Sequence, residues 1–205
     1  YPISAREEAC LMAMLSPDLQ DMATFLIHTG LRARELCVLE WAWERQGSPI
    51  VCFEISGEHT KNNQDKLVVC NRVARAIVES RRGNGTQFVF PSPRGGRRSN
   101  VTATGWRRGR VRAADLLESE TGEKAPEGFR TLRVHDLRHT FGQRLRRCGV
   151  VNETRKDLMG HCNGDVTTGY SEVEVAELYR GVEALCGPVL GGNILAFPAK
   201  LPQAS

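Results

Sequence analysis

Apolar residues recur at intervals of three and four through most of the chain, the spacing of an amphipathic helix. Ser4, with Glu7 three residues later, has the pattern of a capping box and predicts that a first helix begins there. Ser16 and Pro17 predict the start of a second helix, and Gly30 predicts its end through a left-handed cap. Further helices are predicted over the ranges 33–41, 73–81, 104–118, 135–148, 153–160 and 172–185.

Two short apolar runs, at 50–55 and 66–70, are typical of β-strands. The polar segment 56–65 between them predicts a hairpin loop, so the strands should pair antiparallel. Residues 88–91 predict a brief extended segment, and the Gly-, Pro- and Arg-rich stretch 92–100 predicts an exposed loop. The pattern as a whole favours a mainly α fold with a small antiparallel sheet, in the α+β class.

The charge of this chain is uneven. Between positions 94 and 156 there are 16 Lys and Arg against 7 Asp and Glu, whereas the remainder holds 12 against 17. A basic region of this kind suggests a polyanion partner such as DNA, although a solvated arginine-rich face is the alternative. The candidate DNA-binding residues are Arg97, Arg98, Arg107, Arg108 and Arg110.

Seven cysteines, an odd number without a CxxC pair, mostly lie within apolar runs. We interpret them as buried, reduced thiols in a cytoplasmic protein. Cys162 beside His161 suggests a metal site, but no further ligands at suitable spacing support one, so no metal is expected. The sequence has neither a signal peptide nor an apolar run near 18 residues, so membrane insertion is not indicated.

The segment VHDLRHTF at 134–141 carries the chemistry. His135 and Arg138 stand three residues apart, so on a helix both project from one face. A histidine exchanges protons near pH 7, and an arginine can bind two oxygens of one phosphate. Arg32 lies upstream in TGLRARELC, and LMGH, ending at His161, precedes Tyr170 by nine residues.

These blocks, in this order, resemble the tyrosine recombinases, also called the phage integrase family, over roughly residues 4–185. The resemblance implies an integrase-type catalytic domain at 1–186 and a C-terminal tail at 187–205 that packs on a neighbouring subunit. A tail that only caps the core of its own domain is the alternative. It also implies a separate N-terminal DNA-binding domain, which is absent from this chain. Double-stranded DNA and further recombinase subunits, a tetramer in synapsis, are the implied partners.

The resemblance also implies a reaction in which a tyrosine attacks a DNA phosphodiester and forms a 3′-phosphotyrosine, without metal, ATP or another cofactor. Arg32 and Arg138 would hold the non-bridging oxygens, and His161 would hydrogen-bond the phosphate. Arg34 departs from the family pattern, in which a small residue is usual; it either faces solvent or adds a second cation.

In the same way, Tyr170 would be the nucleophile and His135 would accept or relay its proton. Tyr179 competes for the nucleophile, but it lies in a helical pattern and is interpreted as a packing residue. Lys61 would protonate the leaving 5′ oxygen. Lys66 is the alternative, and its ordinary role would be protection of a strand edge.

Two other functions remain open. A type IB topoisomerase uses the same chemistry to relax DNA without strand exchange. An inactive DNA-binding module with this fold is the other alternative, and the complete set of six catalytic residues argues against it.

Overall fold

A computed structural model describes residues 1–101, 104–160 and 170–187 of the chain. The α-helices are α1 (Ala5–Met14), α2 (Pro17–Thr29), α3 (Ala33–Cys37), α4 (Arg72–Arg81), α5 (Thr104–Thr121), α6 (Glu127–Arg130), α7 (Val134–Arg147), α8 (Asn152–Leu158) and α9 (Glu172–Glu183). Short 3-10 turns cover η1 (Trp41–Trp43), η2 (Gly57–His59) and η3 (Ala184–Cys186), and the strands are β1 (Cys52–Ile55) and β2 (Lys66–Val69).

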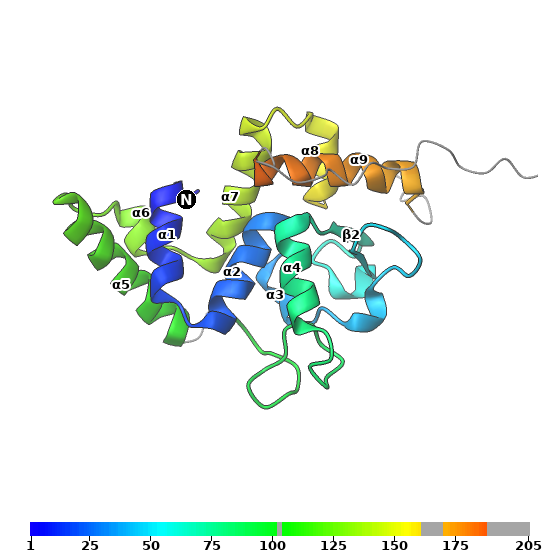
Figure 1. The fold of residues 1–205 in the computed structure, drawn as a ribbon, viewed down its shortest axis with the longest axis horizontal. Coiled ribbons are helices and arrows are strands. Elements are labelled where there is room, and N and C mark those ends of the chain that lie inside the picture. The colour runs from blue at the N-terminus through cyan, green and yellow to red at the C-terminus, as the bar shows by residue number, and fades with distance from the viewer. Residues whose placement is uncertain (102–103, 161–169, 188–205) are drawn as a thin grey trace, which may run out of the picture.

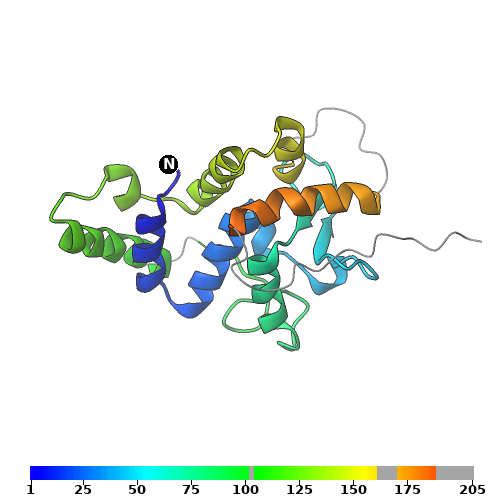
Figure 2. The same cartoon turned by 45° about the horizontal axis from the view of Figure 1, so that its top comes forward.

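Helices α2 and α7 pack against each other, and the other helices form one group on each side of this pair. Helices α1, α5 and α6 pack together at one end of the molecule, shown at the left of Figures 1 and 2. At the other end α9 lies against α8 and β2, while α4 packs on α2. Helix α7, which carries the VHDLRHTF segment, therefore lies between the two groups.

The antiparallel sheet separates two hydrophobic cores. Cys52 pairs with Val69 and Ile55 with Lys66. Because successive strand residues face opposite sides, Phe53 and Val68 enter one core, while Cys52 and Val69 enter the other. Both faces of the sheet are therefore buried, and the predicted mainly α fold with a small antiparallel sheet is confirmed.

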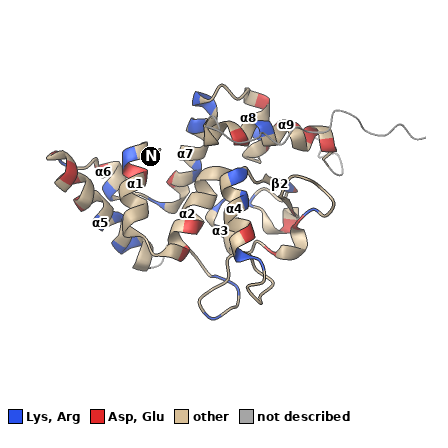
Figure 3. Ribbon diagram, in the orientation of Figure 1, with Lys and Arg blue, Asp and Glu red and all other residues tan. Residues whose placement is uncertain are grey.

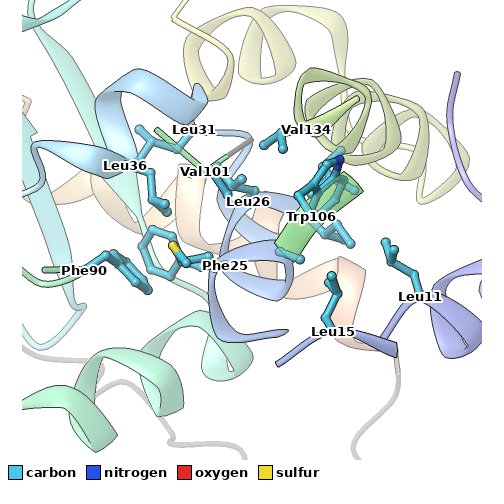
Figure 4. Close-up of a cluster of buried hydrophobic side chains, with 14 of the residues drawn as sticks. Leu11, Leu15, Phe25, Leu26, Leu31, Leu36, Phe90, Val101, Trp106 and Val134 are labelled. Atoms are coloured by element: carbon cyan, nitrogen blue, oxygen red, sulfur yellow. The ribbon is translucent and has the colours of Figure 1, made fainter. Parts of the chain in front are cut away.

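The larger core combines many aliphatic side chains with a few aromatic ones, among them Phe25, Phe90 and Trp106 (Figure 4). The rings of Phe25 and Phe90 lie 5.0 Å apart. Trp106 of α5 is buried, and its Nε1 donates to the carbonyl of Leu132 at 3.1 Å, which satisfies its polar edge. This bond joins α5 to the segment that leads directly into α7.

Local signals predict several helix ends correctly. Ser4 and Glu7 form the capping box of α1, and Gly30 ends α2 in the left-handed conformation at φ 64°. The predicted helix over 33–41 is too long, because α3 ends at Cys37. Beyond it the backbone pairs with a distant segment: the Val89 amide donates to the Leu39 carbonyl at 2.9 Å.

Other predictions are less accurate. Helix α6 lies between the predicted helices over 104–118 and 135–148, where no helix is predicted. Helix α8 begins at Asn152, one residue before the predicted range 153–160, and ends at Leu158, two residues before its end. Four of the described cysteines, Cys10, Cys37, Cys52 and Cys70, are buried as expected, whereas Cys148 is exposed.

Basic and acidic side chains gather on different helices, as the ends of α7 and α9 illustrate (Figure 3). Helix α7 ends in a basic turn with Arg144, Arg146 and Arg147. Helix α9, in contrast, begins with Glu172 and Glu174. Among the described residues, no helix combines the length and the apolarity needed to cross a membrane.

Candidate active site

Arg32 occupies the junction between α2 and α3. Gly30 turns the chain at the end of α2, and Arg32 is then the N-cap residue of α3. Its guanidinium forms an ion pair with Glu35 at 2.8 Å, while its backbone amide donates to the same carboxylate at 3.0 Å. The carboxylate thus fixes both ends of Arg32, whose side chain is only 18% exposed.

Arg138 is buried directly behind this junction. Its guanidinium donates to the carbonyls of Gly30 and Met159, which join α7 to the end of α2 and to the end of α8. Burial, together with the positive charge of Arg32, lowers the pKa of Arg138 to about 10. Arg138 is therefore still a cation at neutral pH, and it lies close enough to Arg32 for the two charges to interact.

A third cation, Lys66, completes the cluster from the sheet. Its Nζ donates to the Glu35 carboxylate at 2.9 Å, and both side chains are 2% exposed. Burial lowers the pKa of Lys66 to about 8, and the charge of Glu35 opposes this shift. The predicted ordinary role of Lys66, protection of an exposed strand edge, is therefore wrong, because its partner 31 residues upstream draws it into the interior.

Glu35 is not among the site residues predicted from the sequence, although it contacts two of the cations. Burial alone would raise the pKa of its carboxyl, but the charge of Lys66 and hydrogen bonds from Arg32 and Lys66 outweigh burial, and the pKa is lowered. The signal is present in the sequence, because Glu35 stands three residues after Arg32 at the start of a helix. We refer to Arg32, Glu35, Lys66 and Arg138 as the cation cluster.

The cation cluster combines three positive charges with one carboxylate. Buried or half-buried charges are costly unless they are compensated, so an excess of positive charge favours a bound anion. The arginine forks match the geometry of phosphate oxygens, whereas lysine provides a point charge. Chemically, this arrangement is suited to a phosphate whose negative charge increases during a reaction.

His135 projects from the first turn of α7, three residues before Arg138. Its ring lies 5.0 Å from that of His139. Partial burial, followed by the charges of His139 and Arg138, lowers the pKa of His135. His135 is therefore neutral at pH 7 and can accept a proton.

Lys61 lies in the loop between β1 and β2 and is exposed. Internal hydrogen bonds order this loop, such as that from the Gly57 amide to Asp65 at 2.8 Å. The neighbouring side chain, Asn62, donates to the carbonyl of Gly160 at 3.0 Å. Because Arg138 binds the carbonyl of Met159, the loop and the cation cluster meet at adjacent peptide groups.

Tyr170 stands immediately before Ser171, the N-cap of α9, and is half-buried against the smaller core. Ser171 forms a capping box with Glu174 that fixes the start of the helix. Arg45 donates to the Tyr170 carbonyl at 2.8 Å and pairs with Glu172 at 3.0 Å. No sequence pattern indicates Arg45, because it lies between elements and its partners are distant.

Tyr179 lies within α9 itself. It packs against the smaller core, and burial together with the charge of Glu183 raises its pKa. A raised pKa makes its phenol a poorer nucleophile near neutral pH. This environment agrees with the interpretation of Tyr179 as a packing residue.

The five candidate DNA-binding arginines are not equivalent. Arg98 pairs with Asp18 and donates to the Pro91 carbonyl, and Arg110 donates to the carbonyls of Thr131 and Leu132. These two side chains hold segments of the protein together. Arg97, Arg107 and Arg108 are exposed, and DNA contact by all five remains a prediction.

Two predicted features lie outside the described residues: His161, the expected phosphate ligand, and the tail from 188 onward. Within the described ranges, no group of three or more His, Cys, Asp or Glu side chains could hold a metal ion.

Comparison with known proteins gives a consistent result. The model of the phage integrase family matches residues 5–177. Tyrosine recombinase XerC of Erythrobacter litoralis (strain HTCC2594) is 28% identical over 177 residues, which cover 85% of this chain and 52% of that protein. The chain thus spans about half the length of this curated relative.

Solved structures show the same fold. The lambda integrase catalytic core superposes with a TM-score of 0.59 at 16% identity, covering 82% of this chain and 95% of that chain. The Tn1549 transposon integrase, solved in complex with circular intermediate DNA, gives a TM-score of 0.53 at 20% identity, covering 80% and 58%.

Proposed function

Because this chain belongs to the phage integrase family, we propose that it is the catalytic part of a site-specific DNA recombinase that cuts and rejoins strands through a 3′-phosphotyrosine. The observation that carries the proposal is the cation cluster, in which Glu35 pairs with Arg32 and Lys66, and Arg138 lies close enough for its charge to interact with those of Arg32 and Glu35. Double-stranded DNA would place its scissile phosphate beside these cations.

In the proposed reaction the Tyr170 oxygen attacks phosphorus, and the bond from phosphorus to the 5′ oxygen breaks. His135, neutral at pH 7, takes the tyrosine proton. Lys61 gives a proton to the departing 5′ oxygen. The DNA remains attached through its 3′ phosphate, so attack by a 5′ hydroxyl from either duplex can reseal it.

The arginines would act mainly in the transition state. Negative charge on the non-bridging oxygens rises as the tyrosine bonds to phosphorus, and Arg32 and Arg138 are held in place before the reaction by Glu35 and by two carbonyls. Preorganised donors of this kind stabilise a transition state without reorganisation during the reaction. His161 would add a further hydrogen bond to the phosphate.

Relatives with solved DNA complexes support the proposed partners. The Tn1549 transposon integrase binds circular intermediate DNA, and lambda integrase binds a Holliday junction as a tetramer. By analogy, this chain would act with other subunits on two duplexes.

The test is covalent trapping on nicked duplexes that carry a target site selected from a duplex library. Wild type should give a protein–DNA adduct on a denaturing gel, and Tyr170→Phe should bind DNA equally but form none. Tyr179→Phe is the matched control and should retain the adduct. A polynucleotide kinase should label the released strand, because 3′ attachment frees a 5′ hydroxyl.

Two outcomes would favour other functions. Relaxation of supercoiled DNA without strand exchange between two sites would favour a topoisomerase. DNA binding without an adduct from any tyrosine would favour an inactive DNA-binding module.

A further inference from the structure

Arg45 connects the tyrosine segment to the sheet. Its guanidinium donates to the Tyr170 carbonyl at 2.8 Å and pairs with Glu172 at 3.0 Å. A second carboxylate, Glu54 of β1, lies 3.6 Å away. One side chain therefore holds the residues on both sides of Ser171, at the point where the chain enters α9.

The backbone of Arg45 is itself fixed. Its amide donates to the Cys52 carbonyl at 3.0 Å, and the preceding residue, Glu44, bridges to Phe53. Strand β1 in turn pairs with β2, where Ile55 faces Lys66 of the cation cluster. A continuous path of backbone hydrogen bonds thus links Arg45 to the element that carries Lys66.

This geometry has a chemical consequence for a nucleophile. In-line attack requires the reacting oxygen to be placed to within a fraction of an ångström, and sites supported by rigid elements hold such positions best. The capping box of α9 binds the Ser171 amide, whereas Arg45 binds the carbonyl of the same peptide group, on the Tyr170 side.

Taking Tyr170 as the nucleophile, as in the proposed function, we propose that Arg45 is a positioning residue that holds this tyrosine against the site of its own chain. Arg45 touches neither the phosphate nor the phenol oxygen in this role. It acts through the Tyr170 carbonyl and Glu172, and the planar guanidinium suits this double contact. A lysine could make one of the two contacts but not both in the same geometry.

The substitution that tests this is Arg45→Ala, with Arg82→Ala as the matched control. Arg82 also forms ion pairs with two carboxylates, Glu44 and Glu79, but it does not contact the tyrosine segment. Arg45→Ala should slow adduct formation from bound DNA by about 10- to 100-fold, the scale expected when a reacting group is misplaced by about 1 Å. The rate of adduct formation by Arg45→Lys should lie between the rates of wild type and Arg45→Ala. Arg82→Ala should cleave at the wild-type rate.

A second measurement separates positioning from general damage. In a Tyr170→Phe background, hydroperoxide anion can serve as a small external nucleophile: it attacks phosphorus, the bond to the 5′ oxygen breaks, and that oxygen takes up a proton. This cleavage needs the cation cluster but not the tyrosine. Adding Arg45→Ala should therefore leave the peroxide rate unchanged.

The outcomes are distinct. Loss of tyrosine attack with unchanged peroxide cleavage supports the positioning role. Equal losses in both reactions, or no loss in either, would overturn it. An adduct that persists in Tyr170→Phe would instead refute the nucleophile assignment in the proposed function, and the inference with it.

Discussion

Glu35 and Lys66 form a buried ion pair, with Nζ 2.9 Å from the carboxylate and each side chain 2% exposed. The pair crosses from the N-terminal turn of α3 to the first residue of β2. Because Glu35 also pairs with Arg32, the ion pair fixes Arg32 relative to the sheet. The shape of the site, as well as its charge, therefore depends on this pair.

Removing Glu35 should cost more stability than removing Lys66. Glu35→Gln leaves a buried ammonium without its carboxylate, a change that costs about 3–5 kcal/mol in comparable pairs. Lys66→Met leaves Glu35 paired with Arg32 at 2.8 Å and should cost less. The double variant should lose less than the sum, and urea unfolding of all four proteins measures the coupling. Additive losses would contradict the pairing.

The pH dependence of cleavage should respond to His139. Partial burial and the charge of His139 both lower the pKa of His135, so the neutral form of His135 persists to more acidic pH. The cleavage rate should fall only as pH drops through this lowered pKa. His139→Asn removes the imidazole that lowers the pKa of His135, so this pKa should rise and the acid limb of the rate profile should move to higher pH. The control is His59→Asn, which removes a ring stacked on Trp43 and should leave the acid limb of the rate profile unchanged.

Lys61 should matter only while the leaving group needs a proton. A duplex in which sulfur replaces the bridging 5′ oxygen releases a thiolate, which departs without protonation. Lys61→Ala should be slow on ordinary DNA and close to wild type on the sulfur substrate. If both substrates show the same defect, the assignment fails; Lys66 is then the residue to test in the same way, since it is also close to Arg138.

Gly30 should not tolerate a side chain. Its φ is +64°, and a Cβ there would lie 2.2 Å from Cδ1 of Phe141 on α7. Gly30→Ala should therefore destabilise the fold by about 2–4 kcal/mol, combining left-handed strain with overpacking. Gly149→Ala is the control, because its φ is +75° but no atom lies within 4 Å of its Cβ position. Equal losses of stability in the two variants would mean that the contact with Phe141 is unimportant.

The features that the sequence predicts well here are local. The capping box of Ser4 and Glu7 and the cap at Gly30 depend on neighbouring residues alone, and both are confirmed. The end of α3 depends on pairing with residues near Val89, so helical periodicity extends it too far.

In the candidate site, too, the residues that belong to local motifs are predicted from the sequence, whereas the roles that depend on distant contacts are not. Arg32 and Arg138 are identified from their motifs, and the structure brings them together through the Gly30 carbonyl. Burial of Lys66 requires a carboxylate that is distant in sequence, and the role of Arg45 requires the fold that brings Tyr170 to it. Such pairings become visible only once tertiary contacts are known.

Arg138 joins the Gly30 carbonyl, from the first part of the chain, to the Met159 carbonyl. During synthesis on the ribosome this bond cannot close until the end of α8 has emerged from the exit tunnel, and Tyr170 emerges later still. A nascent chain that has not reached Tyr170 therefore lacks the proposed nucleophile, and one that ends before Met159 also lacks this bond of the cation cluster. We expect translation products that stop before Tyr170 to form no covalent adduct with DNA.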